Sequence, residues 1–173
     1  MSFRKINTDD FFVNPITKFS DEWMLLTAGD ANGGYNTMTI SWGHMGAIWG
    51  NSGGMPSVAI YVRPQRYTKE FIDSNDMFTL SVLSPEYKEA LAYLGSASGR
   101  DGNKVLKAGL TPVFDLGTTY FDEADMVLVC RKLYHFALQE DGFVDKSIID
   151  INYPKKDFHE MYIGEIVSIL VKE

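Results

Sequence analysis

The sequence predicts a mainly β protein with peripheral helices, arranged as a barrel or a sandwich. Three observations carry this prediction. Short runs rich in β-branched and aromatic residues recur along the chain, Gly, Asn or Asp separates them, and only two segments carry good helix signals. Such spacing favours a barrel or sandwich over a doubly wound parallel sheet.

The predicted strands are listed in chain order: residues 23–28, 35–42, 57–62, 77–82, 126–138 and 162–171. Residues 29–34, three of which are glycine, are expected to form the turn between the first two strands. No internal repeat interrupts this order, and the polar loop 96–104 is too short to link two domains. The sequence therefore predicts a single domain over residues 1–173.

The first predicted helix follows the third strand. Thr68 is expected to cap it, Glu70 lies in its first turn, and Phe71 and Ile72 face inward. The second has a stronger start signal, because the hydroxyl of Ser84 precedes a proline at the first helical position. Its apolar residues 87, 90, 91 and 94 follow helical spacing, and residue 95, a glycine, is expected to end it.

Composition excludes several classes of function. The net charge of −7 argues against non-specific binding to nucleic acid or to anionic membranes. No apolar run reaches membrane-spanning length, and residues 1–5 lack the apolar core of a signal peptide. A cytoplasmic protein is the expectation. Cys130 is the only cysteine, so no intramolecular disulfide can form, and its apolar surroundings predict a buried structural thiol.

A cationic turn is the first candidate site. Arg63 and Arg66 bracket Pro64 just before the helix expected at Thr68. Two guanidinium groups beside the positive end of a helix would bind a phosphate without a glycine-rich loop. The alternative is that both arginines are simply solvated in a turn.

A second cationic loop contains Arg100 and Lys104, with Gly99 and Gly102 allowing close approach of the backbone. On its own it indicates a surface loop. It becomes part of an anion site only if the fold brings it near the turn at residues 63–68.

Residues 36–43 are the second candidate, as an extended segment of small and uncharged residues. Asn36, Thr37 and Thr39 can hydrogen bond to the edge of a heterocycle, while Met38 and Trp42 can supply apolar contact. The alternative is that the hydroxyl groups are ordinary strand residues and the others belong to the core.

No acid–base pair stands out, so no catalytic side chain is predicted. The three histidines, at positions 44, 135 and 159, are scattered without metal-ligand spacing, so no metal site is predicted either. Rossmann and Walker motifs are absent from the sequence. Any nicotinamide dinucleotide would have to bind transiently by another route.

In order and spacing, residues 36–43 and 63–68 resemble the flavin reductase-like family, and within it the flavoredoxins. The likeness covers roughly residues 20–171 and includes the segments 46–50, 78–82, 98–104 and 162–166. It implies a split β-barrel that binds FMN, usually a homodimer with the flavin near the subunit interface.

The resemblance also implies roles for individual residues. Those beside the isoalloxazine ring would be Asn36, Thr37, Met38, Thr39, Ser41 and Trp42. Those around the ribityl phosphate would be Arg63, Arg66, Tyr67 and Thr68, with Arg100 and Lys104 as further candidates. These twelve residues are the predicted cofactor site.

The leading functional hypothesis is an FMN-dependent oxidoreductase that takes hydride from NADH or NADPH. It would pass electrons to free flavin, a partner protein or another acceptor. Because hydride moves directly between the two rings, the protein needs to align them and needs no acid–base dyad. The alternatives are a flavoredoxin-type electron carrier whose bound FMN is reduced by a separate partner, and a flavin-binding module without turnover.

Overall fold

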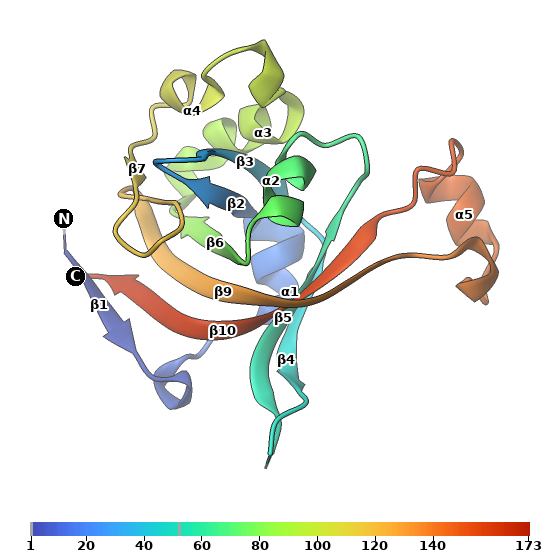
Figure 1. The fold of residues 1–173 in the computed structure, drawn as a ribbon, viewed down its shortest axis with the longest axis horizontal. Coiled ribbons are helices and arrows are strands. Elements are labelled where there is room, and N and C mark those ends of the chain that lie inside the picture. The colour runs from blue at the N-terminus through green and yellow to red at the C-terminus, as the bar shows by residue number, and fades with distance from the viewer. Residues whose placement is uncertain (1, 52) are drawn as a thin grey trace.

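One antiparallel sheet of eight strands forms the body of the protein (Figure 1). The computed structural model describes residues 2–51 and 53–173. Along the sheet the order is β3-β2-β6-β9-β10-β5-β4, and β1 pairs with β10 off this path. The strands are β1 Phe3–Ile6, β2 Met24–Asp30, β3 Gly34–Ile40, β4 Gly43–Ile48, β5 Met55–Val62, β6 Met77–Leu83, β9 Ala124–Ala137 and β10 Glu160–Lys172. Two short strands, β7 Pro112–Val113 and β8 Tyr120–Phe121, pair with each other apart from this sheet.

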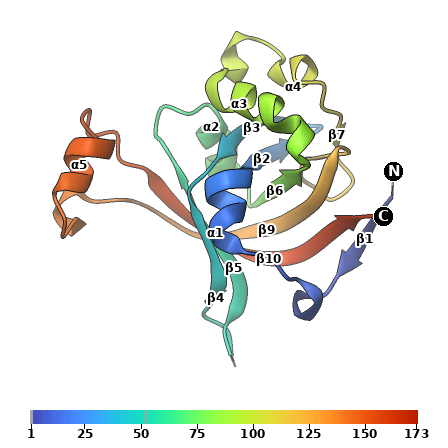
Figure 2. The ribbon, with the colours of Figure 1, turned by 180° about the vertical axis from the view of Figure 1, so that it is seen from behind.

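Short helices surround the sheet. They are α1 Pro15–Thr17, α2 Thr68–Ser74, α3 Lys88–Ser96, α4 Lys104–Lys107 and α5 Ser147–Asn152. A π-helical turn at Lys18–Glu22 follows α1, and 3-10 turns lie at Thr8–Asp10, Pro85–Tyr87, Gly99–Asp101 and Glu140–Gly142. In Figure 1, α3 and α4 lie together above β2 and β3, whereas α5 lies at the end of an arm that joins β9 to β10. Seen from behind, α1 crosses in front of the sheet (Figure 2).

The two faces of β2 show how the strands build two apolar clusters. Side chains alternate along a strand, so neighbouring residues face opposite ways. Leu26 packs into the larger cluster with Ile60 and Phe78, whereas Leu25 packs with Leu91 and the other apolar residues around α3. One face of β2 therefore contributes to the larger core and the other face to the core around α3, and a third, smaller cluster includes Val127 and Val129 of β9.

The predicted mainly β fold is confirmed, and all six predicted strands are present. The main difference concerns residues 35–42, which were expected to form one strand. The structure ends β3 at Ile40, leaves Ser41 and Trp42 outside both strands, and starts β4 at Gly43. The sequence did not predict β4 because its residues are mostly exposed and two of its six are glycine, so it lacks the pattern of a half-buried strand.

Capping at the two predicted helix starts differs from the prediction. Thr68 is the first residue of α2 and makes no capping hydrogen bond; its hydroxyl instead accepts a hydrogen bond from Asn36. Ser84 is the N-cap residue before Pro85, as predicted, but its side chain makes no capping hydrogen bond, the segment starts with a 3-10 turn, and α3 ends at Ser96, one residue past the predicted end. Hydroxyl groups near helix ends have several possible partners, and at Thr68 a tertiary contact replaces the cap.

Cys130 is completely buried in β9, as predicted, and this burial raises the pKa of its thiol. None of the helices in the described part of the chain is long and apolar enough to cross a membrane.

Candidate functional site

The turn between β5 and α2 is held by its own backbone. The N–H of Arg66 donates to the carbonyl of Arg63 at 3.1 Å, and the N–H of Lys69 donates to the carbonyl of Arg66 at 2.9 Å. The N–H of Glu70 donates to the carbonyl of Tyr67 at 3.1 Å. These bonds use two of the donors that the start of α2 was expected to leave unpaired. Any anion bound here must therefore be held mainly by side chains.

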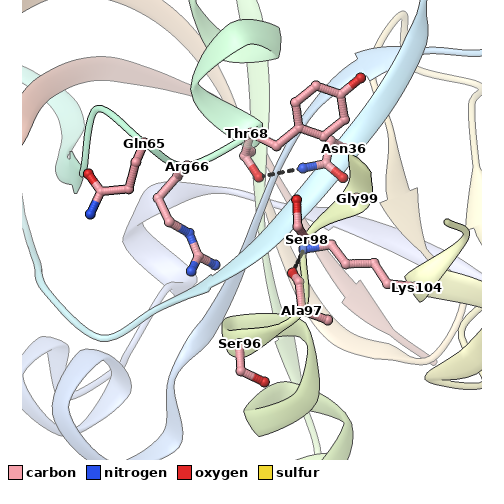
Figure 3. Close-up of a pocket in the computed structure, with 10 residues that line it drawn as sticks. Asn36, Gln65, Arg66, Thr68, Ser96, Ala97, Ser98, Gly99 and Lys104 are labelled. Atoms are coloured by element: carbon pink, nitrogen blue, oxygen red, sulfur yellow. Dashed lines mark hydrogen bonds between the residues drawn. The ribbon is translucent and has the colours of Figure 1, made fainter. Parts of the chain in front are cut away.

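This turn faces the loop after α3 across a hollow of about 140 Å³, called here the cationic hollow (Figure 3). Its lining residues are Asn36, Gln65, Arg66, Tyr67, Thr68, Ser96, Ala97, Ser98, Gly99 and Lys104. The fold thus brings the second cationic loop beside the first cationic turn. The sequence predicted that the second loop would contribute to an anion site only if it lay near this turn, and it does.

A buried polar contact fixes the two sides of the cationic hollow. The Asn36 amide on β3 donates to the Thr68 hydroxyl at 2.8 Å, and both residues are almost completely buried. Gly99 lies so close that a Cβ atom there would come within 2.2 Å of the Asn36 side-chain oxygen. Only a glycine lets the loop approach β3 this closely.

Lys104 reaches the cationic hollow from beneath α3. Its side chain is buried, and its ammonium donates to the carbonyls of Leu94 at 3.2 Å and Ala97 at 2.9 Å. These carbonyls lie at the C-terminal end of α3, where a cation is favourable. Burial, and then the nearby charge of Arg66, lower the pKa of Lys104 to about 8. An ammonium has three donors, so one remains for a further acceptor.

Arg66 is half-buried and extends into the cationic hollow (Figure 3). Burial lowers the pKa of its guanidinium. Within residues 2–51 and 53–173, no group hydrogen bonds or forms an ion pair with this side chain. No acidic residue lines the hollow, so the two positive charges of Arg66 and Lys104 repel each other without a carboxylate to balance them. Such an arrangement suits an anion with several oxygens, such as a phosphate.

The structure places the other two predicted arginines outside the cationic hollow. Arg63 donates to the Asp157 carboxylate at 2.6 Å and to the Asn152 carbonyl at 2.8 Å, and so ties the end of β5 to the arm. Arg100 forms an exposed ion pair with Glu70. Both guanidinium groups already have acidic partners, in contrast to Arg66.

A second hollow of about 250 Å³ lies further along β3 and is called here the edge hollow. It is lined by Met38, Thr39, Ile40, Ser41, Trp42, Tyr61, Arg63 and His159. In the described sheet, β3 is an end strand that pairs only with β2. The backbone N–H and C=O groups along its outer edge are therefore not used by another strand, and they can serve the polar edge of a ring.

Two of the predicted ring-side threonines serve the fold instead. Thr37 is fully buried, where its hydroxyl bonds to Thr27 at 2.8 Å and to the Leu26 carbonyl at 3.0 Å. Thr39 lines the edge hollow, but its hydroxyl donates to the carbonyl of Leu91 at 2.5 Å. Polar contacts on this side would therefore come from the β3 backbone more than from its hydroxyl groups.

His159 lines the edge hollow, and no pattern in the sequence predicted this role. Its ring lies 5.0 Å from that of Trp42, and its Nδ1 is 2.8 Å from the Tyr153 hydroxyl. Burial, and then the charge of Arg63, lower the pKa of His159 to about 4. The imidazole is therefore neutral at neutral pH, and it can present its Nε2 atom as an uncharged polar group.

A separate polar cluster lies where α2 meets β10. Ligand atoms of Asp73, His135 and Glu160 lie within 4.8 Å of one another, a spacing that a metal ion could use. The Lys69 ammonium, however, lies 2.7 Å from both carboxylates, and the Tyr162 hydroxyl donates to Asp73 at 2.5 Å. Lys69 already supplies the positive charge that a metal would bring, so we assign no metal here.

Fold and site together define a split-barrel protein with a phosphate-sized cationic hollow beside an open strand edge. The family model for the flavin reductase like domain matches residues 16–173, and the chain belongs to this family. This confirms the resemblance inferred from the sequence. No curated protein matches the chain by sequence.

Solved structures confirm the split-barrel fold. An FMN-binding domain of a flavin reductases-like enzyme from Shewanella baltica OS155 aligns with a TM-score of 0.66 and 16% identity, over 98% of this chain and 77% of that one. Flavoredoxin of Desulfovibrio vulgaris (Miyazaki F) aligns with a TM-score of 0.63 and 24% identity, over 87% and 69%. A protein described as a flavin reductase with a split barrel domain, from Shewanella frigidimarina NCIMB 400, aligns with a TM-score of 0.65 and 20% identity, over 88% and 67%. At these identities the likeness is one of fold.

Proposed function

We propose that the protein is an FMN-binding oxidoreductase that takes hydride from NADH or NADPH onto the flavin. It passes the electrons to free flavin or to another acceptor. The observation that carries the proposal is the pair of opposed cations, Arg66 and Lys104, in a hollow without an acidic residue. Membership of the flavin reductase-like family supports a flavin as the ligand.

The residues of the two hollows match the two ends of FMN. Arg66, Lys104 and the hydroxyl groups of Thr68 and Ser98 would hold the phosphate, because charged and neutral donors converge there. The edge hollow would hold the ring, since it combines the open backbone edge of β3 with the apolar side chains beside it. Both hollows are bordered by β3 and by the segment 61–68, so one elongated molecule can reach from one to the other.

When bound, a flavin supplies the capacity to accept and donate hydride. The chain's own groups bind and orient. The β3 edge fixes the plane of the ring, and neutral His159 offers a polar contact without adding charge. No acid–base pair is needed for the transfer itself.

An anaerobic titration tests the proposal. The protein is loaded with FMN, and NADH or NADPH is added without oxygen while the visible absorbance of the flavin is followed. Rapid bleaching supports a reductase. Bleaching only after a reduced partner protein is supplied supports a flavoredoxin-type carrier, and no reduction by either supports a flavin-binding module. Failure to take up FMN would refute the flavin site altogether.

We also propose that the protein is a cytoplasmic homodimer, as the family resemblance implies. Large apolar side chains are exposed at the end of β4, at Ile48 and Trp49, and on β9, at Tyr134 and Phe136. The rings of Trp49 and Tyr134 lie 6.4 Å apart, so these residues form a patch that a second copy would bury. Light scattering across a range of protein concentrations tests this, and a strictly monomeric protein would contradict it.

A further inference from the structure

A third hollow, of about 540 Å³, lies beside the edge hollow and is called here the apolar hollow. Its lining residues are Pro15, Ile16, Phe19, Ser20, Ser41, Trp42, Gly43, His44, Tyr61, Leu138 and Tyr153. They come from α1 and the turn after it, from the β3–β4 connection, from β4 and β5, and from the arm. Its volume falls within the range of about 300–1,000 Å³ that is typical of small-molecule sites.

The lining indicates an uncharged occupant. It contains no Asp, Glu, Lys or Arg, and its largest members are aromatic or aliphatic. Ile16 is 74% exposed and Trp42 44% exposed, so apolar surface there is open to solvent. A charged group placed against these walls would lose hydration without gaining a partner. A flat apolar molecule would instead bury surface from both sides.

One wall of the apolar hollow is polar. The hydroxyl of Tyr61 lies 3.3 Å from Nδ1 of His44, and the two rings meet edge to face with centroids 5.9 Å apart. Burial raises the pKa of Tyr61, so its hydroxyl keeps its proton at neutral pH. The pair can donate or accept one hydrogen bond from a ligand without adding a carboxylate or an ammonium.

The apolar hollow and the edge hollow share a wall. Ser41, Trp42 and Tyr61 line both. A molecule in the apolar hollow would therefore lie directly beside whatever occupies the edge hollow. This contiguity links the apolar hollow to the proposed ring site, while the remaining lining residues of the apolar hollow belong to neither the edge hollow nor the cationic hollow.

We propose that the apolar hollow binds an uncharged aromatic molecule of one to three fused rings, with a polar substituent against Tyr61 and His44. Binding itself needs no flavin. That the bound molecule is the electron acceptor rests on the proposed function. A free flavin ring and a smaller aromatic compound both have the chemistry that this hollow requires.

The test uses 2-naphthol as the probe, with isothermal titration calorimetry on the FMN-free protein. We expect saturable binding of one molecule per chain. The matched control is 2-naphthoate, which has the same rings and a carboxylate, and it should bind about tenfold more weakly or worse because its charge must be desolvated. Equal affinity for both compounds would overturn the proposal.

Two isoleucines with almost equal exposure provide matched variants. Ile16→Asp places a carboxylate at the apolar hollow, whereas Ile151→Asp places one on α5 outside it; these side chains are 74% and 75% exposed. We expect the first variant to lose about tenfold or more in naphthol affinity and the second to stay within about twofold. Tyr61→Phe should lose about fivefold, the effect of one hydrogen bond. Equal losses in both Asp variants would overturn the assignment.

Two further arms separate this inference from the proposed function. If naphthol binds but FMN does not, the proposed function fails and the apolar site stands. With FMN loaded, riboflavin that displaces naphthol identifies a free flavin as the ligand, and riboflavin that does not displace it identifies a smaller aromatic compound. Naphthol affinity that falls as protein concentration rises would show that a second copy covers the hollow, and would overturn the proposal.

Discussion

Two clusters of charged side chains on this protein differ in whether their charges are balanced. At the α2–β10 junction, Lys69 lies between the carboxylates of Asp73 and Glu160, and every charge meets its opposite. In the cationic hollow, Arg66 and Lys104 face each other with no acid in the lining. The pKa directions follow this contrast. Burial would lower the pKa of Lys69, but its hydrogen bonds outweigh burial and raise it, whereas burial and Arg66 lower that of Lys104.

The difference separates charges that stabilise the fold from charges that serve a ligand. This chain carries more acids than bases, with a net charge of −7, so it does not lack carboxylates for pairing. One of them, Glu70, pairs with Arg100 next to the cationic hollow and leaves Arg66 alone. Unbalanced cations at a buried position cost stability, and such sites are typical of function.

Replacing Arg66 should have the largest effect on flavin binding. Arg66→Ala should weaken FMN binding by about 10- to 100-fold, because charge-assisted hydrogen bonds to a phosphate contribute about 1.5–3 kcal/mol. Riboflavin, which lacks the phosphate, should bind both proteins alike. Fluorescence titration measures both affinities.

Arg100→Ala is the matched control for this variant, since Arg100 is exposed and paired with Glu70. Its FMN affinity should stay within about twofold. Without flavin, Arg66→Ala should unfold at the same urea concentration as the wild type or a higher one, because a charge repulsion is removed. Unchanged FMN affinity would mean that the cationic hollow is not the phosphate site.

Lys69 provides the opposite case. Lys69→Ala leaves the carboxylates of Asp73 and Glu160 without their cation, and it should lower the free energy of unfolding by about 2 kcal/mol. FMN affinity should not change. Urea unfolding measures the loss.

The free energy of unfolding at acid pH is the control for the Lys69→Ala variant. Burial opposes ionisation of Asp73 and Glu160, but their hydrogen bonds outweigh it and lower both pKa values; Lys69 contributes to both, with Tyr162 at Asp73 and His135 at Glu160. Their contribution is therefore present above the unfolded pKa of about 4 and is lost as the pH falls through the lower folded values. The difference in free energy of unfolding between the wild type and Lys69→Ala should become smaller as the pH falls through that range. A gap that stays constant would show that Lys69 acts by packing alone.

Gly99 determines how closely its loop approaches β3 at the cationic hollow. Gly99→Ala forces a Cβ atom within 2.2 Å of the Asn36 side chain and should cost about 1–2 kcal/mol of stability while shifting the loop. FMN affinity should fall with it. Gly142→Ala, where a Cβ meets nothing within 4 Å, is the control and should behave as the wild type. Thermal unfolding and FMN titration on both variants test this, and identical behaviour would contradict the close approach.

The smallest expected effect is one of pH. Lys104 has a folded pKa of about 8, so above this pH it loses its charge, and FMN affinity should fall about fivefold between about pH 7 and pH 9.5. In the FMN-free protein, stability should change in the opposite direction to FMN affinity. Between about pH 8 and the ordinary pKa of a lysine, the unfolded chain binds more protons at Lys104 than the folded chain does, so the free energy of unfolding rises with pH in that range. Lys104→Met should remove both trends. Riboflavin binding should show no such dependence, and a parallel loss would place the titrating group elsewhere.

The sequence was enough for the mainly β fold, for six of the ten described strands and for the family. It left open whether the two cationic loops approach each other. It did not separate Arg63 from Arg66, since both flank the same proline. The difference lies in Asp157, which is 94 residues from Arg63 and is brought to it only by the arm. Spacing along the chain carries no information about such a partner.

The ring side was harder to predict for a related reason. Hydroxyl groups on β3 were expected to face a ligand, but Thr37 and Thr39 bond to neighbouring elements of the fold. What β3 offers instead is its backbone edge, and that depends on its place at the end of the sheet. His159, isolated in sequence, joins the edge hollow only because the arm returns beside Trp42.

The position of β10 in the sheet has a consequence for how the chain is made. It follows all other described strands in sequence, yet it lies between β9 and β5 and also pairs with β1. Until β10 emerges from the ribosome, the hairpin of β4 and β5 has no neighbouring strand to join. The edge hollow needs Tyr61 from that hairpin and His159 from just before β10, so it is completed only after β10 has been made and has joined the sheet. A ligand that contacts both sides would therefore report that β10 has paired with β5.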